Sequence, residues 1–234
     1  WALYPMMQRW AEEFRIIHPG VTIDVSAGGA GKGMADALSD AVDIGMVSRA
    51  VKPEETQKGA LAFPVVKDAV VATMNANNPF AVAIRARGVT REQLKTIFLS
   101  GHGAWDRLSG GLMGTVRPTI TLFARADACG AAQTWALYLD PAATQEKLKG
   151  TGVSGDPGMA EAVGKDRMAL GYNNIGFAYD PATRKPYPSL AIVPLDVNGN
   201  GIIDPAENFY DTLDTLVAAI NAGAYPSPPA RDLY

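Results

Sequence analysis

The sequence predicts an α/β fold in two lobes with a ligand cleft between them. Three observations support this. Residues 3–17 carry an apolar stripe at helical spacing, formed by Leu3, Met6, Met7, Trp10, Phe14 and Ile17. HPGVTIDVS then reads as a turn and an alternating strand, and SAGGAGKGMADALSD as a glycine-rich turn that opens a helix. VDIGMVS, at 42–48, reads as the next strand, and this rhythm predicts a parallel sheet with ligand loops at the carboxyl ends of its strands.

The rest of the chain repeats this alternation. We expect strands at 69–79, 120–127, 168–179 and 190–196, and helices at 90–101, 129–139, 155–166 and 208–223. Two strand-like crossings would join the lobes. The sequence therefore predicts a hinged protein with residues 1–68 and 190–234 in lobe I and residues 69–189 in lobe II.

Composition excludes several classes of protein. Of 234 residues, 47% are hydrophobic and 19% are charged, which is typical of a globular chain with a sizeable core. The net charge of −3 argues against a nucleic-acid partner. A single cysteine excludes an internal disulfide framework. Because the chain opens at Trp1 inside a helical pattern, we expect a processed or trimmed product, and a missing signal peptide does not argue against export.

The glycine-rich segment SAGGAGKGM is a candidate anion site. It does not fit the P-loop, which would need glycine at Ser26 and a hydroxyl at Gly33. It does not fit the dinucleotide pattern either, because the spacing after Gly31 is wrong. Glycines nevertheless allow the backbone to approach a ligand, and free amides at a helix start attract anions. The alternative is a simple tight turn between strand and helix.

The segment FARADACG is a second candidate. Arg125 follows an apolar strand, and a helix is expected to begin at Gly130. A guanidinium beside oriented helix amides can bind a tetrahedral oxyanion. Asp127 would hold the guanidinium or accept a hydrogen bond from a protonated ligand. The alternative is an Arg–Asp pair on the surface, which contributes little.

Taken in order, the segments LYPMMQRWAEEF, VSAGGAGKG, VDIGMVSR, FARADACG and ALGYNNIGFAY resemble the phosphate-binding proteins of bacterial ABC importers over nearly the whole chain. The resemblance implies the two-lobed type II periplasmic-binding-protein fold with the anion between the lobes. It implies that the ligand contacts come from the loop before the first helix, the glycine loop, the serine after VDIGMV and the start of the FARADACG helix, at Ala2, Leu3, Tyr4, Gly29, Ala30, Gly31, Ser48, Arg125, Cys129, Gly130 and Ala131. Asp127, proposed above from the residues alone, completes the predicted ligand-binding set.

The chain also departs from that family. The glycine loop lacks a serine at Gly29 or Ala30, and the usual Gly-Ser-Gly-Thr is replaced by residues 128–131, Ala-Cys-Gly-Ala. Two or three hydroxyl donors are therefore absent, and each lost hydrogen bond costs roughly 0.5–1.5 kcal/mol of affinity. The strand that the family places before the first helix is not found in the sequence.

Cys129 raises an enzymatic alternative. A helix start and a nearby arginine would lower the thiol pKa and give a reactive thiolate. A nucleophilic enzyme also needs a base, and the chain offers only His18 and His102. A cysteine phosphatase would need an arginine where Trp135 stands. The other interpretation is a small buried residue in place of serine.

The segment DVNGNGIIDPAE matches the 12-residue calcium loop. Its ligands would be Asp196, Asn198, Asn200, the carbonyl of Ile202, Asp204 and Glu207, with Gly201 at the sharp bend. A strand precedes it where a paired EF-hand has a helix, so we expect a structural Ca²⁺ that clamps the junction of the lobes. The alternative is an Asn/Gly turn without metal.

Together these features predict an extracytoplasmic solute-binding protein, periplasmic or at the cell surface, without catalytic residues. We expect a monomer that closes over a small oxyanion such as phosphate and is recognised by an ABC permease or a membrane sensor. The alternatives are a calcium-stabilised protein for a different, non-phosphate ligand, a calcium-dependent interaction module with a vestigial cleft, and a Cys129-based enzyme.

Overall fold

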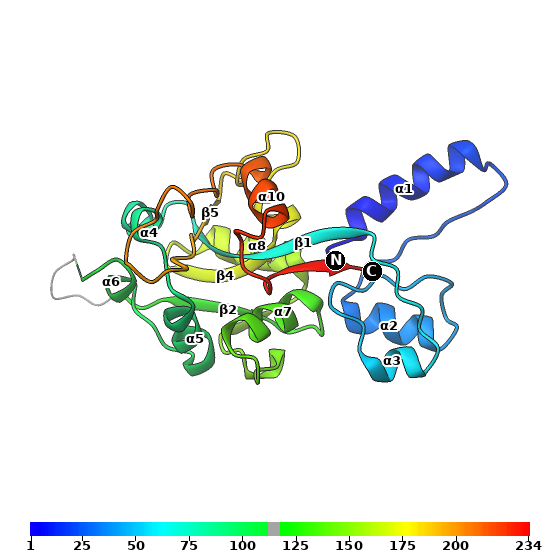
Figure 1. The fold of residues 1–234 in the computed structure, drawn as a ribbon, viewed down its shortest axis with the longest axis horizontal. Helices are drawn as coiled ribbons and strands as arrows, with labels where there is room; N and C mark the ends of the chain where they lie inside the picture. The colour runs from blue at the N-terminus through cyan, green and yellow to red at the C-terminus, as the bar shows by residue number, and fades with distance from the viewer. Residues whose placement is uncertain (112–117) are drawn as a thin grey trace.

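The computed structural model describes residues 1–111 and 118–234. Figure 1 shows two bodies of unequal size, with the two chain ends lying beside each other at the junction. The smaller body holds α1 (Tyr4–Ile17), α2 (Ala30–Leu38) and α3 (Pro53–Gln57). The larger body is an α/β unit, so the predicted two-lobed α/β fold is confirmed.

A six-stranded sheet forms the centre of the described structure. Its strands are β1 (Val66–Asn75), β2 (Thr121–Arg125), β3 (Thr151–Val153), β4 (Ala169–Asn174), β5 (Leu190–Ile192) and β6 (Ala230–Leu233). The order is β3-β2-β4-β1-β5, and β6 pairs with the beginning of β1. Strand β2 is parallel to β3 and β4, whereas β1 is antiparallel to β4, β5 and β6. The predicted parallel sheet is therefore wrong in this respect, because β1 enters the larger body in the opposite direction to β4.

The helices of the larger body are α4 (Ala81–Arg87), α5 (Arg91–Ser100), α6 (Trp105–Leu108), α7 (Gly130–Leu139), η1 (Gln145–Lys147), α8 (Gly155–Lys165), α9 (Ile175–Ala178) and α10 (Leu213–Asn221). The four helices expected here from apolar periodicity are confirmed. Local signals explain their ends: Thr90 and Gln93 form a capping box before α5, and Gly101 ends it with a φ of 80°.

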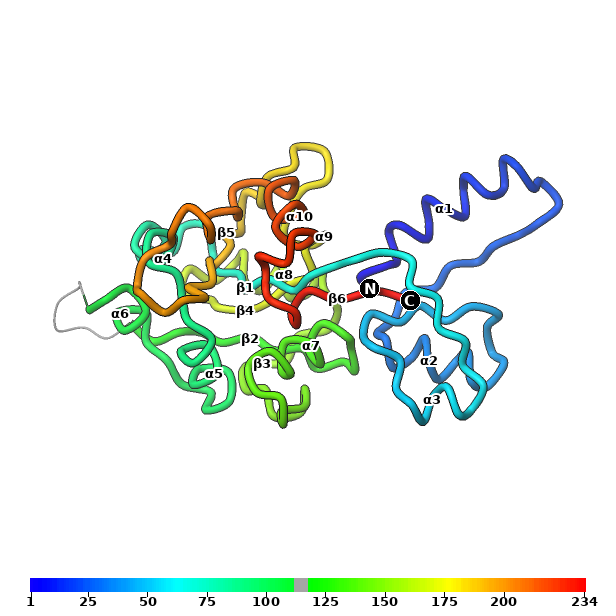
Figure 2. Tube along the Cα trace, viewed as in Figure 1, coloured from blue at the N-terminus to red at the C-terminus, as the bar shows by residue number. Residues whose placement is uncertain are grey.

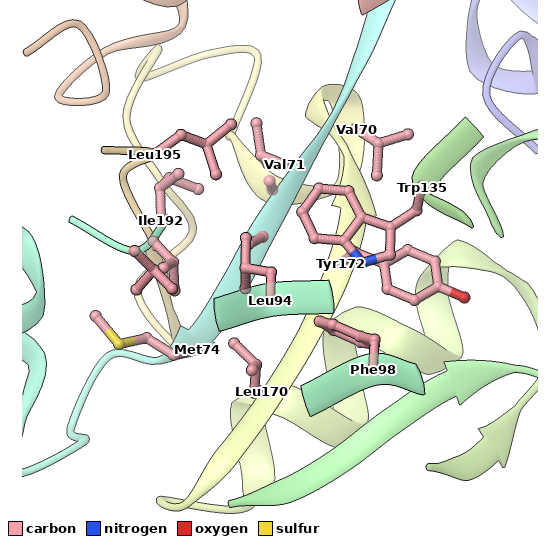
Figure 3. Close-up of a cluster of buried hydrophobic side chains, with 14 of the residues drawn as sticks. Val70, Val71, Met74, Leu94, Phe98, Trp135, Leu170, Tyr172, Ile192 and Leu195 are labelled. Carbon is pink, nitrogen blue, oxygen red and sulfur yellow. The ribbon is translucent and has the colours of Figure 1, made fainter. Parts of the chain in front are cut away.

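An aromatic cluster anchors the core of the larger body (Figure 3). Trp135 of α7 stacks on Tyr172 of β4 with ring centroids 5.8 Å apart, and Phe98 of α5 meets Trp135 edge-on at 5.7 Å. The hydroxyl of Tyr172 accepts a hydrogen bond from the backbone N–H of Arg125 at 3.0 Å. The core therefore holds the carboxyl end of β2, from which the FARADACG loop leaves.

The lobe boundary differs from the expected one at residue 190. Strand β5 pairs with β1, with Ile192 opposite Thr73, and α10 buries Leu213 and Leu216 in the core of the larger body. The segment from 190 to about 225 therefore belongs with residues 69–189, because its apolar side chains cover the same sheet. The end of the chain returns to the smaller body, where Tyr234 exchanges two backbone hydrogen bonds with Val47, of 2.7 and 2.8 Å.

The two strands expected in the smaller body do not form. Residues 21–29 and 44–48 have no assigned helix or strand, and a small cluster of Ala30, Met34 and Val47 forms the core of this body. Helix α1 is confirmed, but its apolar stripe is largely exposed: Phe14 is 43% exposed and Ile17 73%. Figure 2 shows α1 and the segment after it standing away from α2. Among the described residues, no helix combines the length and apolar character needed to span a bilayer.

Candidate oxyanion-binding site

The predicted contact segments meet at the junction of the two bodies. The backbone N of Trp1 donates to the carbonyl of Gly28 at 2.6 Å, which joins the start of α1 to the glycine loop. A Cβ atom built on Gly29 would lie 2.0 Å from the carbonyl oxygen of Ala128, so the glycine loop contacts the start of α7. Ser48 also contacts the start of α7. The start of α1, the glycine loop, Ser48 and the start of α7 therefore lie together although they are separate in the sequence.

Gly130 makes the closest of these approaches. A Cβ atom built on it would lie 1.9 Å from the carbonyl oxygen of Ser48 and 2.5 Å from its hydroxyl oxygen. Only glycine allows the backbones of the two bodies to come this close. The contact couples α7 of the larger body to Ser48 of the smaller one.

Three helices begin at this junction. The amides of Ala30 and Gly31 lie in the first turn of α2, and those of Gly130 and Ala131 in the first turn of α7. First-turn amides have no partner inside their own helix, and the helix dipole favours negative charge there. Ala2 and Leu3 precede α1 in the same way, whereas the amide of Tyr4 already donates to the carbonyl of Trp1 at 3.0 Å. Helix starts of this kind can donate backbone hydrogen bonds to an anion.

Arg125 supplies the buried positive charge. Its side chain is 1% exposed and forms two parallel hydrogen bonds with Asp127, from Nε at 2.7 Å and from Nη2 at 2.5 Å. Nη1 lies 3.0 Å from Oδ2 of Asp156, yet it has no aligned hydrogen-bond partner among the described residues. The carboxylates of Asp127 and Asp156 thus hold the guanidinium from two sides.

The charges around Arg125 keep it ionised. Burial by itself lowers the pKa of Arg125, but the hydrogen bond to Asp127 and the charge of Asp156 outweigh burial and raise this pKa. Burial by itself raises the pKa of Asp127. The hydrogen bonds from Arg125 and from the Gly155 amide have the larger effect, so the pKa of Asp127 lies below its ordinary value. Asp127 therefore remains a carboxylate that holds the guanidinium in place.

Cys129 has the environment of a small buried residue and not that of an activated thiolate. Cys129 caps α7, with Sγ accepting from the amide of Ala132 at 3.4 Å. Burial raises the pKa of its thiol to about 11, although Arg125 acts in the opposite direction. His18 lies at the far end of α1, where its ring contacts Phe14, and His102 follows α5. The site therefore holds a neutral thiol that replaces a capping serine.

Residues that sequence reasoning missed lie behind this site. Asp156 is 1% exposed at the start of α8, and Asn174 is 2% exposed at the end of β4. Arg231 and Asp68 form an ion pair at 3.0 Å between β6 and β1. An acid in a first helical turn is a common surface feature, so the sequence held no signal that Asp156 is buried.

The predicted calcium loop lies on the larger body. The Ile203 amide donates to the Ala86 carbonyl of α4 at 2.9 Å, so the loop packs against α4. Figure 1 shows α4 on the side of the larger body remote from the smaller one, and the expected position at the lobe junction is therefore wrong.

Residues 196–207 form hydrogen bonds among themselves inside the loop. Asp196 and Glu207 are buried, and the carboxylate of Asp196 accepts from the amides of Gly199 at 2.8 Å and Gly201 at 2.9 Å. Gly201 has a φ of 81°, which glycine adopts readily. Among the described residues, no three His, Cys, Asp or Glu side chains gather closely enough to hold a metal ion.

A hollow of about 580 Å³ lies along α7, and Arg231 in its wall contacts the Gly130 carbonyl at the start of that helix. Its walls come from α7, the end of α10, β6 and the segment after Ser48, and they include Leu137, Ile220 and Tyr225. The candidate anion site rests instead on the helix starts and on Arg125, because anion recognition depends on donors and charge.

Comparison with known proteins identifies the family of this chain. The sequence model of the family described as "PBP superfamily domain" matches residues 2–230. A phosphate-binding protein PstS from Methanocaldococcus jannaschii is 23% identical over 250 residues, covering 95% of this chain and 61% of that protein. The Bacillus subtilis phosphate-binding protein PstS is 32% identical over 148 residues, covering 63% of this chain and 46% of that one. The chain thus spans less than two thirds of these relatives.

Solved structures share the fold. A substrate-binding protein from Clostridium perfringens, solved with bound phosphate, has a TM-score of 0.75 at 22% identity, covering 99% of this chain and 81% of that one. An ABC-type phosphate transport receptor from Vibrio cholerae has a TM-score of 0.57 at 20% identity, covering 83% and 73%. With the type II two-lobed fold and a family match over nearly its whole length, the chain belongs to the PBP superfamily domain family.

Proposed function

We propose that this protein binds a phosphate-like oxyanion between its two bodies. The observation that carries the proposal is Arg125, which is buried, charged and held by Asp127 and Asp156, with the first turn of α7 close by. Such a guanidinium and first-turn amides suit a tetrahedral anion. The names of the relatives, which are phosphate-binding proteins, support this choice of ligand.

The biological role follows from the same relatives. We propose a monomeric, extracytoplasmic receptor, periplasmic or at the cell surface, that presents the bound anion to an ABC permease or a membrane sensor. Closure of the two bodies over the anion would be the recognised state. A catalytic step is not part of this role, and the raised pKa of the Cys129 thiol, to about 11, argues against a thiolate enzyme.

Isothermal titration calorimetry tests the ligand. Phosphate, arsenate, sulfate, molybdate and tungstate would each be titrated into the purified chain, and we expect saturable one-to-one binding of phosphate and arsenate. Absent hydroxyl donors reduce affinity by roughly 0.5–1.5 kcal/mol for each lost hydrogen bond. If no oxyanion bound at millimolar concentration, the proposed function would be wrong. Preference for sulfate or molybdate would support the alternative of a non-phosphate ligand.

We also propose that residues 196–207 bind a structural Ca²⁺. The pattern of oxygen ligands and Gly201 matches the calcium loop, and the burial of Asp196 and Glu207 supports a role inside the loop. Binding would need Asn198, Asn200, Asp204 and the Ile202 carbonyl to turn toward the ion. Ca²⁺ in such a loop would hold the connection between β5 and α10 and supply no chemistry at the anion site. A calcium-dependent interaction module remains the rival if chelation abolishes binding of a protein partner.

A further inference from the structure

A buried ion pair joins the two strands that run between the bodies. Asp68 of β1 and Arg231 of β6 are opposite each other in the antiparallel ladder, with Nη2 and Oδ2 3.0 Å apart. Their side chains are 9% and 7% exposed. The neighbouring pair in the same ladder, Lys67 and Asp232, is 3.7 Å apart, and its side chains are 64% and 45% exposed. The two pairs therefore differ in burial while they share the same strands.

Arg231 also contacts two elements of the anion site. Its Nη1 donates to the carbonyl oxygen of Gly130 at 2.9 Å, in the first turn of α7. Its Nη2 donates to the side-chain oxygen of Asn174 at the end of β4. One guanidinium thus holds β1, α7 and β4 together, and its planar shape is well suited to several acceptors at once.

The contacts continue from Asn174 to Arg125. The Asn174 side-chain amide donates to Oδ1 of Asp156 at 2.9 Å, and Oδ2 of Asp156 lies 3.0 Å from Nη1 of Arg125. A continuous buried polar chain therefore runs from the crossing strands to the guanidinium that we assign to the anion. Its members are Asp68, Arg231, Asn174, Asp156 and Arg125.

We propose that Arg231 is a positioning residue of the anion site. It acts on the start of α7 through Gly130, and on Arg125 through Asn174 and Asp156. It thereby links anion affinity to β1 and β6, the strands that run between the bodies. This inference rests on the proposed oxyanion function. Without the guanidinium, Oδ1 of Asn174 loses the donor that orients the side chain, and the Asn174 amide is no longer fixed on Asp156. Asp68 is then a buried carboxylate without its partner, and buried unpaired charges rearrange their surroundings. Arg125 and the first turn of α7 would no longer be held in the geometry that suits the anion.

The test compares Arg231→Met with Lys67→Met, which removes the exposed pair from the same ladder. Phosphate affinity is measured by calorimetry, and the melting temperature is measured without phosphate. We expect Arg231→Met to weaken phosphate binding by about tenfold or more, and Lys67→Met to leave the dissociation constant within about twofold of the original chain. A lower melting temperature with an unchanged dissociation constant would show a purely structural role and overturn the inference.

A double-mutant cycle tests the route through Asn174. If Arg231 acts through Asn174 and Asp156, Arg231→Met combined with Asn174→Ala should lose no more affinity than the worse single variant. If the double variant instead loses affinity by the product of the two single-variant factors, the route through Asn174 is wrong. Arg231→Lys is the second variant if Arg231→Met does not fold: an ammonium cannot reproduce the planar set of contacts, so we still expect a weaker affinity, and full affinity would contradict the proposal.

The outcomes separate the inference from the proposed function. If the original chain binds none of the oxyanions, the proposed function fails, and this inference fails with it. If the original chain binds phosphate and Arg231→Met and Arg231→Lys bind equally well, the function stands and only the inference is wrong.

Discussion

Gly130 packs directly against the carbonyl group of Ser48, and a Cβ atom at Gly130 would lie only 1.9 Å from that oxygen. Because Ser48 belongs to the smaller body and Gly130 to the larger one, the two bodies meet here without an intervening side chain. The glycine loop also reaches the start of α7, because a Cβ atom at Gly29 would lie 2.0 Å from the carbonyl oxygen of Ala128. Disturbing the contact between Gly130 and Ser48 should affect closure more than folding.

Gly130→Ala should therefore weaken phosphate binding. The new methyl group has to separate the bodies or shift α7, which costs about 1–3 kcal/mol, the usual cost of overpacking. Calorimetry would measure the affinity, and small-angle X-ray scattering would show whether phosphate still compacts the molecule. Gly158→Ala in α8 is the matched control, because a Cβ there meets nothing within 4 Å. Equal affinities in both variants would contradict the assigned contact.

Arg125→Ala should remove most of the phosphate affinity. Hydrogen bonds to charged groups contribute about 1.5–3 kcal/mol each, and the variant also leaves Asp127 and Asp156 without their cation. Arg125→Lys keeps the charge but not the paired bonds, so we expect an intermediate affinity. Arg184→Ala is the control, because Arg184 and its partner Asp214 are exposed. Unchanged binding by Arg125→Ala in calorimetry would rule out the site.

Asp127→Asn should lower stability in a pH-dependent manner. The hydrogen bonds from Arg125 and the Gly155 amide outweigh the effect of burial and lower the pKa of Asp127 below its ordinary value of 3.8. A lowered acid pKa contributes stability above 3.8, and this contribution is lost as the pH falls through the lowered value. Urea unfolding should give a lower free energy of unfolding for Asp127→Asn than for the original chain at neutral pH. This difference should become smaller in acid. A difference that stays constant with pH would contradict this role.

Cys129 should react slowly with iodoacetamide. With a thiol pKa of about 11, only roughly one thiol in a thousand is ionised at pH 8. The alkylation rate of the folded chain should rise with pH up to about 11. The urea-unfolded chain is the reference, since its thiol should have the ordinary pKa of 9.0. Rapid alkylation at neutral pH that phosphate blocks would instead revive the enzymatic alternative.

Removal of calcium should lower thermal stability without changing anion affinity. If residues 196–207 bind Ca²⁺, saturating calcium stabilises the folded chain by about 2.7 kcal/mol at a hundredfold excess over the dissociation constant. Differential scanning calorimetry with chelator and with added calcium would measure the shift. Asp196→Ala should melt at the same temperature under both conditions. If the melting temperature does not change with calcium, residues 196–207 form a turn without metal.

The sequence by itself determined the features that depend on neighbouring residues. Apolar periodicity and the Thr90 capping box predict helices, because intrahelical hydrogen bonds and caps involve residues three or four apart. The glycine loop and Arg125 with Asp127 could be identified for the same reason. A two-residue spacing places this carboxylate beside the guanidinium, and the structure contains that pair.

Only the tertiary structure decided which segments share a core and which polar groups are buried. The direction of β1 and the place of residues 190–225 depend on pairing across the sheet, which no local pattern specifies. Burial raised the thiol pKa of Cys129 that local charge alone would lower. The chain of contacts from Arg231 to Arg125 joins residues more than 100 positions apart. Desolvation and long-range pairing depend on the whole packed structure, so local sequence could point to the candidate loop at Arg125 but not to the buried charges around it.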